Sequence, residues 1–356
     1  MKLTKFDFVL LAVILYFTFI GGTFYSQLHY FLRVANQIIV TGLLGGWLIW
    51  RLKQQLGLPH TSLDAALGLY LAAGLLSAIF GQSARFSFES LWLSLAHVLA
   101  FCLLVDLSRR GYSAKLVWAF YMASAVVCLV GLAEFAAWYA GVGPFAMGWL
   151  EVGGWRHPLP PQLYRLNITL NGSTPLANYL SLLITPALAL VISLPRRDQN
   201  RPALLVWLAL AVPVEILTFS RTGVIGLGVS LLLLLAGWLV VYRQQGARLR
   251  QQWAGQPRWQ RWAALLVLLL VIVLAGWWLV RAFTQRTYSI GFRFNLWQAA
   301  LQIFQQEWLL GVGPGNFGRA LLRLNDSTLP RQQVGSAHNI YLNTAAELGL
   351  VGLLAG

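Results

Sequence analysis

The sequence predicts an all-α, polytopic membrane protein that crosses the bilayer about ten times. Of its 356 residues, 58% are apolar and 10% are charged, whereas about a quarter of the residues of a soluble domain are charged. Mostly apolar runs recur along the chain, each with the roughly 18 to 25 residues that a helix needs to cross the hydrocarbon layer. These two observations argue against a soluble globular domain.

The apolar runs follow one another along the whole chain. Nine complete runs occupy residues 6–25, 34–50, 63–80, 88–107, 116–141, 173–194, 202–219, 222–242 and 262–283. A tenth begins at His338 and is still apolar at Gly356. Lys2 and Lys5 precede the first run as in a signal peptide, but no small-residue cleavage site follows, so we expect an uncleaved first helix.

These runs predict a simple domain organisation. We expect five N-terminal transmembrane helices in residues 1–141, an outer loop at 142–172, four helices in 173–283, a large outer loop at 284–337, and the start of a last helix at 338–356. Because the chain stops within an apolar run, we expect that helix to be incomplete and the sequence to be truncated.

The distribution of lysine and arginine predicts the orientation. If the N-terminus is cytoplasmic, alternate loops fall inside and hold fifteen of the 26 basic residues, as the positive-inside rule requires. These are Lys2, Lys5, Arg51, Lys53, Arg109, Arg110, Lys115, Arg196, Arg197, Arg201, Arg243, Arg248, Arg250, Arg258 and Arg261. Because they lie in short loops between spans, the net charge of +15 indicates a membrane surface and not nucleic acid.

The basic residues expected outside are all arginine: Arg33, Arg85, Arg156, Arg165, Arg221, Arg281, Arg286, Arg293, Arg319, Arg323 and Arg331. The planar guanidinium suits bidentate binding of phosphate or carboxylate. The alternative is a side chain that reaches the lipid headgroups from the end of a span. We prefer headgroup contact for Arg33 and Arg85, and a functional role for Arg221 and Arg293.

The second outer loop contains a predicted amphipathic helix at residues 290–308. Phe292, Leu296 and Ile303 share its apolar side, which predicts a helix lying in the plane of the membrane interface. Arg293 is placed to stack on Trp297 one turn away. The following Gly311-Val312-Gly313-Pro314-Gly315-Asn316-Phe317 lacks the spacing and the preceding strand of a nucleotide-binding loop, so we interpret it as a sharp turn.

A histidine stands at the mouth of the last expected helix. With Ser336 as helix N-cap, His338 falls in the first turn, where the positive helix end lowers its pKa and favours the neutral form that a general base requires. Asn339, Asn343 and Glu347 follow at intervals of four and share one face. A helix-packing hydrogen bond is the alternative role for a lone membrane histidine.

Arg221 lies in the short outer link Thr218-Phe219-Ser220-Arg221-Thr222-Gly223 between two spans. Glu215 is nearly two turns deeper and is a candidate counter-ion, while Glu134 is more simply structural. No histidine and cysteine cluster has the spacing of a metal site, so we expect no metal and no other cofactor. Cys102 and Cys128 fall inside expected spans and indicate no disulfide framework.

Together these motifs resemble the O-antigen ligase and polymerase superfamily of bacterial membrane glycosyltransferases. The resemblance rests on the link around Arg221, Arg293 with Trp297, the glycine-rich turn, and Ala337-His338-Asn339 with Glu347-Leu348-Gly349-Leu350. It covers about residue 171 to the end, whereas the first five spans agree only in hydropathy. It implies an all-α fold of the C-type glycosyltransferase kind with a large periplasmic loop, in the bacterial inner membrane.

The resemblance also implies a reaction. A glycan would move from an undecaprenyl-diphosphate carrier to a glycan, lipid or protein acceptor on the periplasmic face, without metal or nucleotide. His338 would accept the proton of the acceptor hydroxyl or assist its attack at the anomeric carbon. Arg221 and Arg293 would hold the diphosphate, and Asn339, Glu347 and Glu215 would support them. Fixed guanidiniums stabilise the charge that develops on such a leaving group.

Other functions remain open at the level of the sequence. O-antigen ligase, O-antigen or exopolysaccharide polymerase, and protein O-oligosaccharyltransferase share the same kind of donor. A bicarbonate-type anion transporter is a second alternative, because outer arginines also recruit anions. A transporter is expected to show paired broken helices and an internal repeat, and the surroundings of Pro186 and Pro213 do not match each other. A scaffold would leave the polar residues after His338 unexplained.

Overall fold

The computed structural model describes residues 13, 14, 16, 30–140, 151, 152, 155, 156, 166, 173–195, 197–241, 257, 262, 287–324 and 334–356. Nearly all of the expected spans at 6–25 and 262–283, and most of the first outer loop, lie outside these residues. The chain divides into two compact units, which are considered separately. Unit 1 comprises Met1–Tyr25 and Ala114–Gln285, and unit 2 comprises Ser26–Ser113 and Arg286–Gly356.

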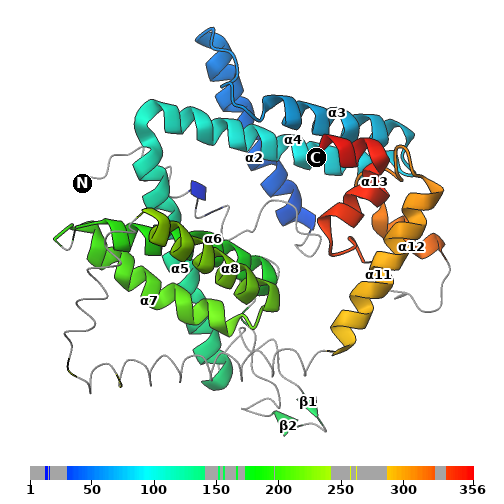
Figure 1. Ribbon diagram of the computed structural model, residues 1–356. Coiled ribbons are helices and arrows are strands. Elements are labelled where there is room, and N and C mark those ends of the chain that lie inside the picture. The colour runs from blue at the N-terminus through cyan, green and yellow to red at the C-terminus, as the bar shows by residue number, and fades with distance from the viewer. Residues whose placement is uncertain are drawn as a thin grey trace. The chain divides into compact units, whose positions relative to one another are not determined.

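The described residues form helices and one very short hairpin, which confirms the all-α class (Figure 1). The helices are α2 (Tyr30–Lys53), α3 (Asp64–Phe80), α4 (Ala84–Leu107), the π-helix η1 (Ser108–Tyr112), α5 (Ser113–Ala140), α6 (Ser173–Ser193), α7 (Asn200–Leu217), α8 (Arg221–Val241), α11 (Thr287–Gln306), α12 (Phe317–Arg323) and α13 (Ile340–Ala355). The hairpin pairs β1 (Glu151–Val152) with β2 (Trp155–Arg156) in antiparallel fashion.

Four helical stretches among the described residues are long and apolar enough to cross a membrane: Ala84–Ala137, Ser173–Ser193, Asn200–Leu217 and Arg221–Trp238. The helices at Asp64–Phe80 and Ile340–Ala355 are apolar but shorter. The membrane class is therefore supported, while the count of about ten spans remains a prediction. Within the first stretch Gly111 has a φ of 86°, and this left-handed residue separates the two expected spans.

Unit 1 is built around α6, which packs against both α7 and α8. Its core joins residues of α5, α6 and α7, and Tyr121 and Trp207 meet edge to face with ring centroids 4.8 Å apart. The polar atoms of these aromatic rings are satisfied, because the Tyr121 hydroxyl donates to the Leu183 carbonyl and the Trp207 indole N–H donates to Ser124 Oγ. Buried aromatic rings with satisfied polar atoms give this bundle a defined core.

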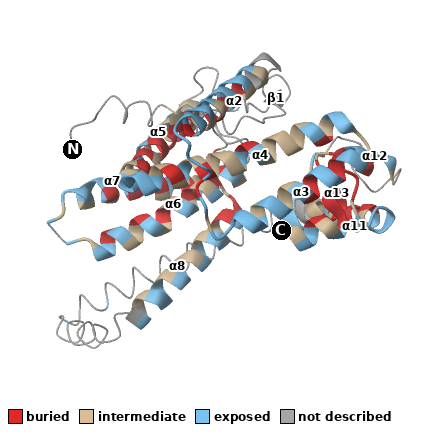
Figure 2. Ribbon diagram, turned by 90° about the horizontal axis from the view of Figure 1, so that it is seen from above, coloured by how far each residue is buried: buried red, intermediate tan, exposed pale blue. Residues whose placement is uncertain are grey.

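In unit 2, α13 packs against α3 and α11, and α3 packs against α4. The core of unit 2 lies where α11, α12 and α13 meet, and its buried residues are drawn in red in Figure 2. The amphipathic helix is confirmed as α11, which begins and ends slightly earlier than expected. Its apolar face is covered by protein, since Leu296 and Ala300 are 0% exposed. Residues of α12 and α13 supply the apolar surface that covers it, and the position of α11 in the plane of the membrane interface remains a prediction.

Segments that the sequence assigns to the same side of the membrane meet in unit 2. On the expected outer side, the Gln82 N–H donates to the Val312 carbonyl. On the expected inner side, Arg51 forms an ion pair with Asp106 at 2.6 Å, and Arg110 bonds the same carboxylate at 3.0 Å. Many large apolar side chains remain exposed, Leu232 of α8 among them at 66%, as expected for surfaces that face lipid.

Candidate functional site

The glycine-rich turn after α11 packs directly against α13. Gly311, Gly313 and Gly315 have φ values of 68°, 95° and 75°, which only glycine adopts readily. The Val312 N–H donates to the Ala346 carbonyl at 3.0 Å, and the Gly313 N–H donates to the Glu347 carbonyl at 2.9 Å. A sharp turn was expected here and is confirmed. Its partner is the helix that follows His338.

Helix α13 is broken at Gly349, whose φ and ψ are 64° and −159°. The break leaves backbone donors without partners in the helix, and carbonyl groups in the turn after α11 accept their hydrogen bonds. The Leu350 N–H donates to the Trp308 carbonyl at 2.8 Å, and the Val351 N–H donates to the Leu309 carbonyl at 3.3 Å. The Gly349 backbone also lies so close to the Leu309 carbonyl that a Cβ atom would collide with it. The expected continuous span is therefore two short helical pieces in the described chain.

Glu347 of α13 connects this helix to the glycine-rich turn through hydrogen bonds. Its Oε1 accepts a hydrogen bond from the Phe317 N–H at 3.1 Å, and the carboxylate also accepts from the Gly315 N–H and the Asn343 side chain. The Ser77 hydroxyl of α3 donates to the Glu347 carbonyl at 2.8 Å. Glu347 thus has a clear structural role. It fixes the glycine turn, and its hydrogen-bonding capacity is largely used inside the protein.

The loop before α13 holds His338 in a left-handed conformation with a φ of 52°. The helix N-cap is Asn339, whose Oδ1 accepts from the Tyr341 and Leu342 N–H groups at 3.0 and 3.2 Å. The prediction of Ser336 as the cap is wrong, because Asn339 satisfies these first helical donors. Ser336 instead accepts a hydrogen bond from the His338 N–H at 3.5 Å. His338 therefore precedes the helix.

A second contact fixes the chain on the other side of His338. The Ala337 N–H donates to Asn343 Oδ1 at 3.0 Å, and the amide of Asn343 in turn bonds Glu347. The backbone at His338 is thereby tied to α13 from before and after the histidine. A left-handed non-glycine residue costs free energy and persists only where its surroundings hold it. Such residues cluster at functional sites.

The electrostatic surroundings favour a neutral imidazole. Desolvation lowers the pKa of His338, and the positive charge of Arg293 lowers it further. The expected direction of the shift is confirmed, but the cause differs from the expected helix end, since His338 lies outside α13. An unprotonated ring nitrogen at neutral pH is what a general base requires.

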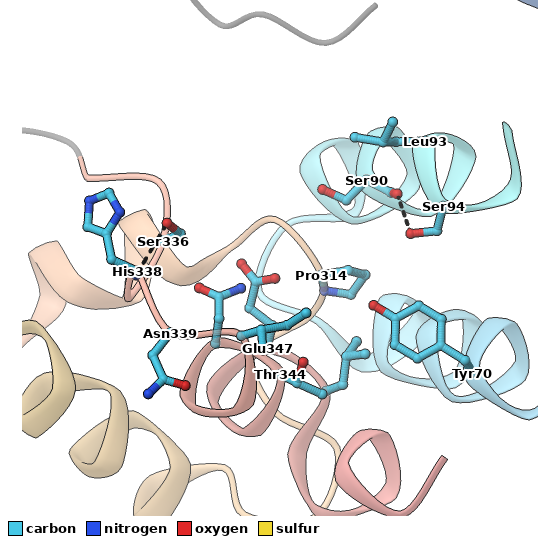
Figure 3. Close-up of a pocket in the computed structure, with 13 residues that line it drawn as sticks. Tyr70, Ser90, Leu93, Ser94, Pro314, Ser336, His338, Asn339, Thr344 and Glu347 are labelled. Carbon is cyan, nitrogen blue, oxygen red and sulfur yellow. Dashed lines mark hydrogen bonds between the residues drawn. The ribbon is translucent and has the colours of Figure 1, made fainter. Parts of the chain in front are cut away.

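A polar pocket of about 420 Å³ opens beside this loop. His338, Asn339, Asn343 and Glu347 line it from the α13 side (Figure 3). Asn339, Asn343 and Glu347, which are four residues apart, thus share one face, as expected. The opposite wall comes from α3 and α4 and includes Tyr70, Ser90, Leu93 and Ser94.

Arg293 lies on α11, in the same unit as His338, and its charge acts on the imidazole. It does not line the polar pocket. Trp297 makes an edge-to-face contact with Phe294 at 5.2 Å. The cation–π pairs of the described residues are Arg51 with Trp47, Arg110 with Trp50 and Arg319 with Phe86, and the expected Arg293–Trp297 stack is not among them.

Arg221 lies in unit 1, where it is the first residue of α8. The link before it is as short as expected, since α7 ends at Leu217 and Ser220 Oγ accepts from the Gly223 N–H at 3.2 Å. Gly223 is required because a Cβ atom would come within 2.8 Å of Glu215 Oε1. The Ser220 cap and the close packing at Gly223 place Arg221 at the N-terminal end of α8, where the helix dipole also favours anions.

Glu215 is 1% exposed and is held by α6, because Ser181 Oγ donates to its Oε1 at 3.1 Å. The ion pair with Arg221 that was expected as one possibility is not among the ion pairs of the described residues. In the described part of the chain no three His, Cys, Asp or Glu side chains are placed to hold a metal ion. Independence from metal remains a prediction.

Fold and site together define a polytopic α-helical membrane protein with a polar pocket and a backbone-fixed histidine among its lining residues. Residues 203–355 match the model of a protein family described as O-antigen ligase. This match confirms the resemblance and supports a membrane glycosyltransferase of the O-antigen ligase or polymerase type. Comparisons with curated proteins and with solved structures found no match.

The motifs of the sequence do not include the wall of the pocket that α3 and α4 provide. Tyr70, Ser90 and Ser94 lie in the part of the chain where only hydropathy was informative, outside the matched region. A tyrosine and serines within apolar runs were the available signal, since buried polar groups in a span need partners. Which polar residues share a pocket depends on how the helices pack.

Proposed function

We propose that the protein transfers a glycan from an undecaprenyl-diphosphate carrier to an acceptor hydroxyl at the outer face of the bacterial inner membrane. The observation that carries the proposal is the backbone-fixed His338 in the lining of a polar pocket, within a region that matches the O-antigen ligase family. Ligase, polymerase and protein O-oligosaccharyltransferase activities are variants of this function that differ in the acceptor.

The proposed step is a displacement at the anomeric carbon. The acceptor oxygen forms a bond to that carbon, while the bond between the carbon and the diphosphate oxygen breaks. The electron pair leaves with the lipid diphosphate, and the acceptor proton moves to the free nitrogen of His338. Desolvation and Arg293 both lower the pKa of His338, so the ring is ready to accept this proton at neutral pH.

The leaving diphosphate needs positive charge, because negative charge develops on it in the transition state. Arg293 is supplied by α11 close enough to influence His338, and Arg221 is supplied at the start of α8. In the proposal both guanidiniums bind the diphosphate, which suits their bidentate geometry. They would stabilise the transition state without a metal ion.

The test measures glycan transfer in membranes that carry the full chain, using a labelled undecaprenyl-diphosphate-linked donor. His338→Ala should lower the rate about 10²- to 10⁴-fold, the usual contribution of a general base. Arg293→Ala should also lower it strongly. His60→Ala is the matched histidine control, because His60 is an exposed residue in the loop between α2 and α3. Undiminished transfer by both site variants would overturn the mechanism.

A further inference from the structure

The polar pocket contains hydroxyl groups that the protein does not use. Among the described residues, the hydroxyls of Tyr70 and Thr344 make no hydrogen bond, although both residues line the pocket. The Tyr70 hydroxyl points toward the side of the pocket formed by α13 in Figure 3. Hydroxyls that line a pocket without a protein partner are available to a ligand.

Other polar groups of the pocket are already engaged. Asn339 caps α13, Asn343 holds the Ala337 N–H, and Glu347 accepts from the glycine turn. The Ser94 hydroxyl donates to the Ser90 carbonyl of its own helix at 3.1 Å and keeps its acceptor capacity. The groups left for a ligand are therefore mainly neutral hydroxyls, and His338 is among the lining residues. Among the described residues, no lysine or arginine lines the pocket.

This chemistry selects a class of ligand. Neutral hydroxyls exchange hydrogen bonds with the hydroxyls of a sugar, while Tyr70 and Leu93 offer carbon surface to its less polar face. The volume of about 420 Å³ lies within the range of about 300–1,000 Å³ for small-molecule sites. We propose that the pocket is the acceptor subsite and binds an uncharged, hydroxylated sugar, with Tyr70 and Thr344 as specificity-determining residues. This assignment rests on the proposed function.

The position of His338 distinguishes an acceptor from a donor subsite. A general base must contact the hydroxyl from which it takes the proton, and His338 lines this pocket. Arg293 influences the same histidine without lining the pocket. The diphosphate would therefore lie on the Arg293 side of His338, and the acceptor sugar would lie on the Tyr70 side.

The variants Tyr70→Phe and Thr344→Val each remove one hydroxyl with little change in shape. Because these hydroxyls make no hydrogen bond among the described residues, their loss should leave the fold intact. Tyr112→Phe and Thr41→Val are the matched controls, since Tyr112 belongs to η1 and Thr41 bonds the Gln37 carbonyl of its own helix. Unfolding midpoints of all four detergent-solubilised proteins verify folding.

The first measurement is binding of methyl β-glucoside, methyl β-galactoside and methyl α-mannoside to the full-length protein by saturation-transfer NMR, with glucuronate for comparison. At least one neutral glycoside should bind more tightly than glucuronate. Each site variant should weaken that binding about two- to tenfold, as expected for one lost neutral hydrogen bond. The control variants should bind as the wild type does.

The second measurement is the transfer assay with the glycoside as acceptor. The site variants should raise the KM for the acceptor and leave the KM for the undecaprenyl-diphosphate donor unchanged. Unchanged glycoside binding in both variants, or a change in donor KM alone, would overturn the subsite while His338-dependent transfer still held. Glycoside binding that depends on Tyr70 and Thr344 without any transfer by the wild type would instead overturn the proposed function and leave the sugar site standing.

Discussion

At the scale of single residues, the polar side chains around His338 divide into those that hold the backbone and those that remain free. Asn339, Asn343 and Glu347 hold the backbone through hydrogen bonds to N–H groups. Their even spacing resembled a functional stripe, but its main effect is to fix the loop that carries His338 and the turn that faces it. Side chains that satisfy buried donors in this way are costly to remove.

The pH dependence of transfer belongs to this scale. Desolvation and, to a smaller extent, Arg293 lower the pKa of His338. The protonated, inactive form should therefore appear only below the ordinary imidazole pKa of about 6.5, and kcat/KM should fall as the pH drops through the lowered value. Arg293→Gln removes a positive charge, so it should move the acid limb to higher pH in addition to lowering the rate.

The measurement is the midpoint of the acid limb of kcat/KM, since this midpoint reports the free enzyme independently of the height of the profile. Arg85→Gln is the control, because Arg85 is an exposed arginine at the start of α4. An acid limb that stays in place in Arg293→Gln would contradict the electrostatic link between Arg293 and His338.

At the scale of elements, the break in α13 and the turn after α11 fit each other through close backbone packing. Three glycines with positive φ shape the turn, and Gly349 provides the matching break. The backbones approach so closely that side chains are excluded at Gly311 and Gly349. The glycines of this turn thus serve backbone packing. The same contact sets the distance between α11, which carries Arg293, and the loop of His338.

Gly349→Ala should destabilise the protein by more than about 1 kcal/mol, because alanine is strained at positive φ and its methyl group collides with the Leu309 carbonyl. Gly291→Ala is the contrasting variant. Gly291 lies inside α11 with open space around it, so alanine should stabilise by about 0.5–1 kcal/mol. Unfolding midpoints in detergent provide the comparison, and equal midpoints for the two variants would contradict this account.

At the scale of the whole molecule, the residues singled out by the sequence are divided between the two units. Unit 2 contains His338, Arg293, Glu347 and the polar pocket, while unit 1 contains Arg221 and Glu215. Each unit folds around its own buried core. Within unit 2, segments that are expected on the same side of the membrane bond one another. The alternation of inner and outer loops predicts this pairing.

Site-directed labelling tests the predicted orientation. Gly335→Cys should react with a membrane-impermeant maleimide in intact cells with a permeabilised outer envelope, because residue 335 is exposed and is expected outside. Ser108→Cys, exposed at the start of η1, should react only after the inner membrane is opened. The native Cys102 and Cys128 are buried and give little background. The opposite labelling pattern would reverse the topology.

Local patterns predicted much of the fold. The apolar runs predicted α3, α4, α6, α7 and α8 within a few residues, because a membrane helix must satisfy its backbone internally and is therefore visible as a continuous stretch. The amphipathic period also predicted α11. The protein surface that covers the apolar face of α11 was not predicted, since periodicity shows that a face is apolar but does not identify what covers it.

The sequence by itself determined the membrane class, the positions of most helices and the family resemblance, and it singled out His338 as a candidate, because hydropathy, charge and motif spacing are properties of the chain in order. Only the tertiary structure decided that Asn339 caps α13, that Glu347 braces the glycine turn, and that Tyr70 lies across the pocket from His338. Those relations join residues far apart in the chain. They follow from how the helices pack, which no local pattern specifies.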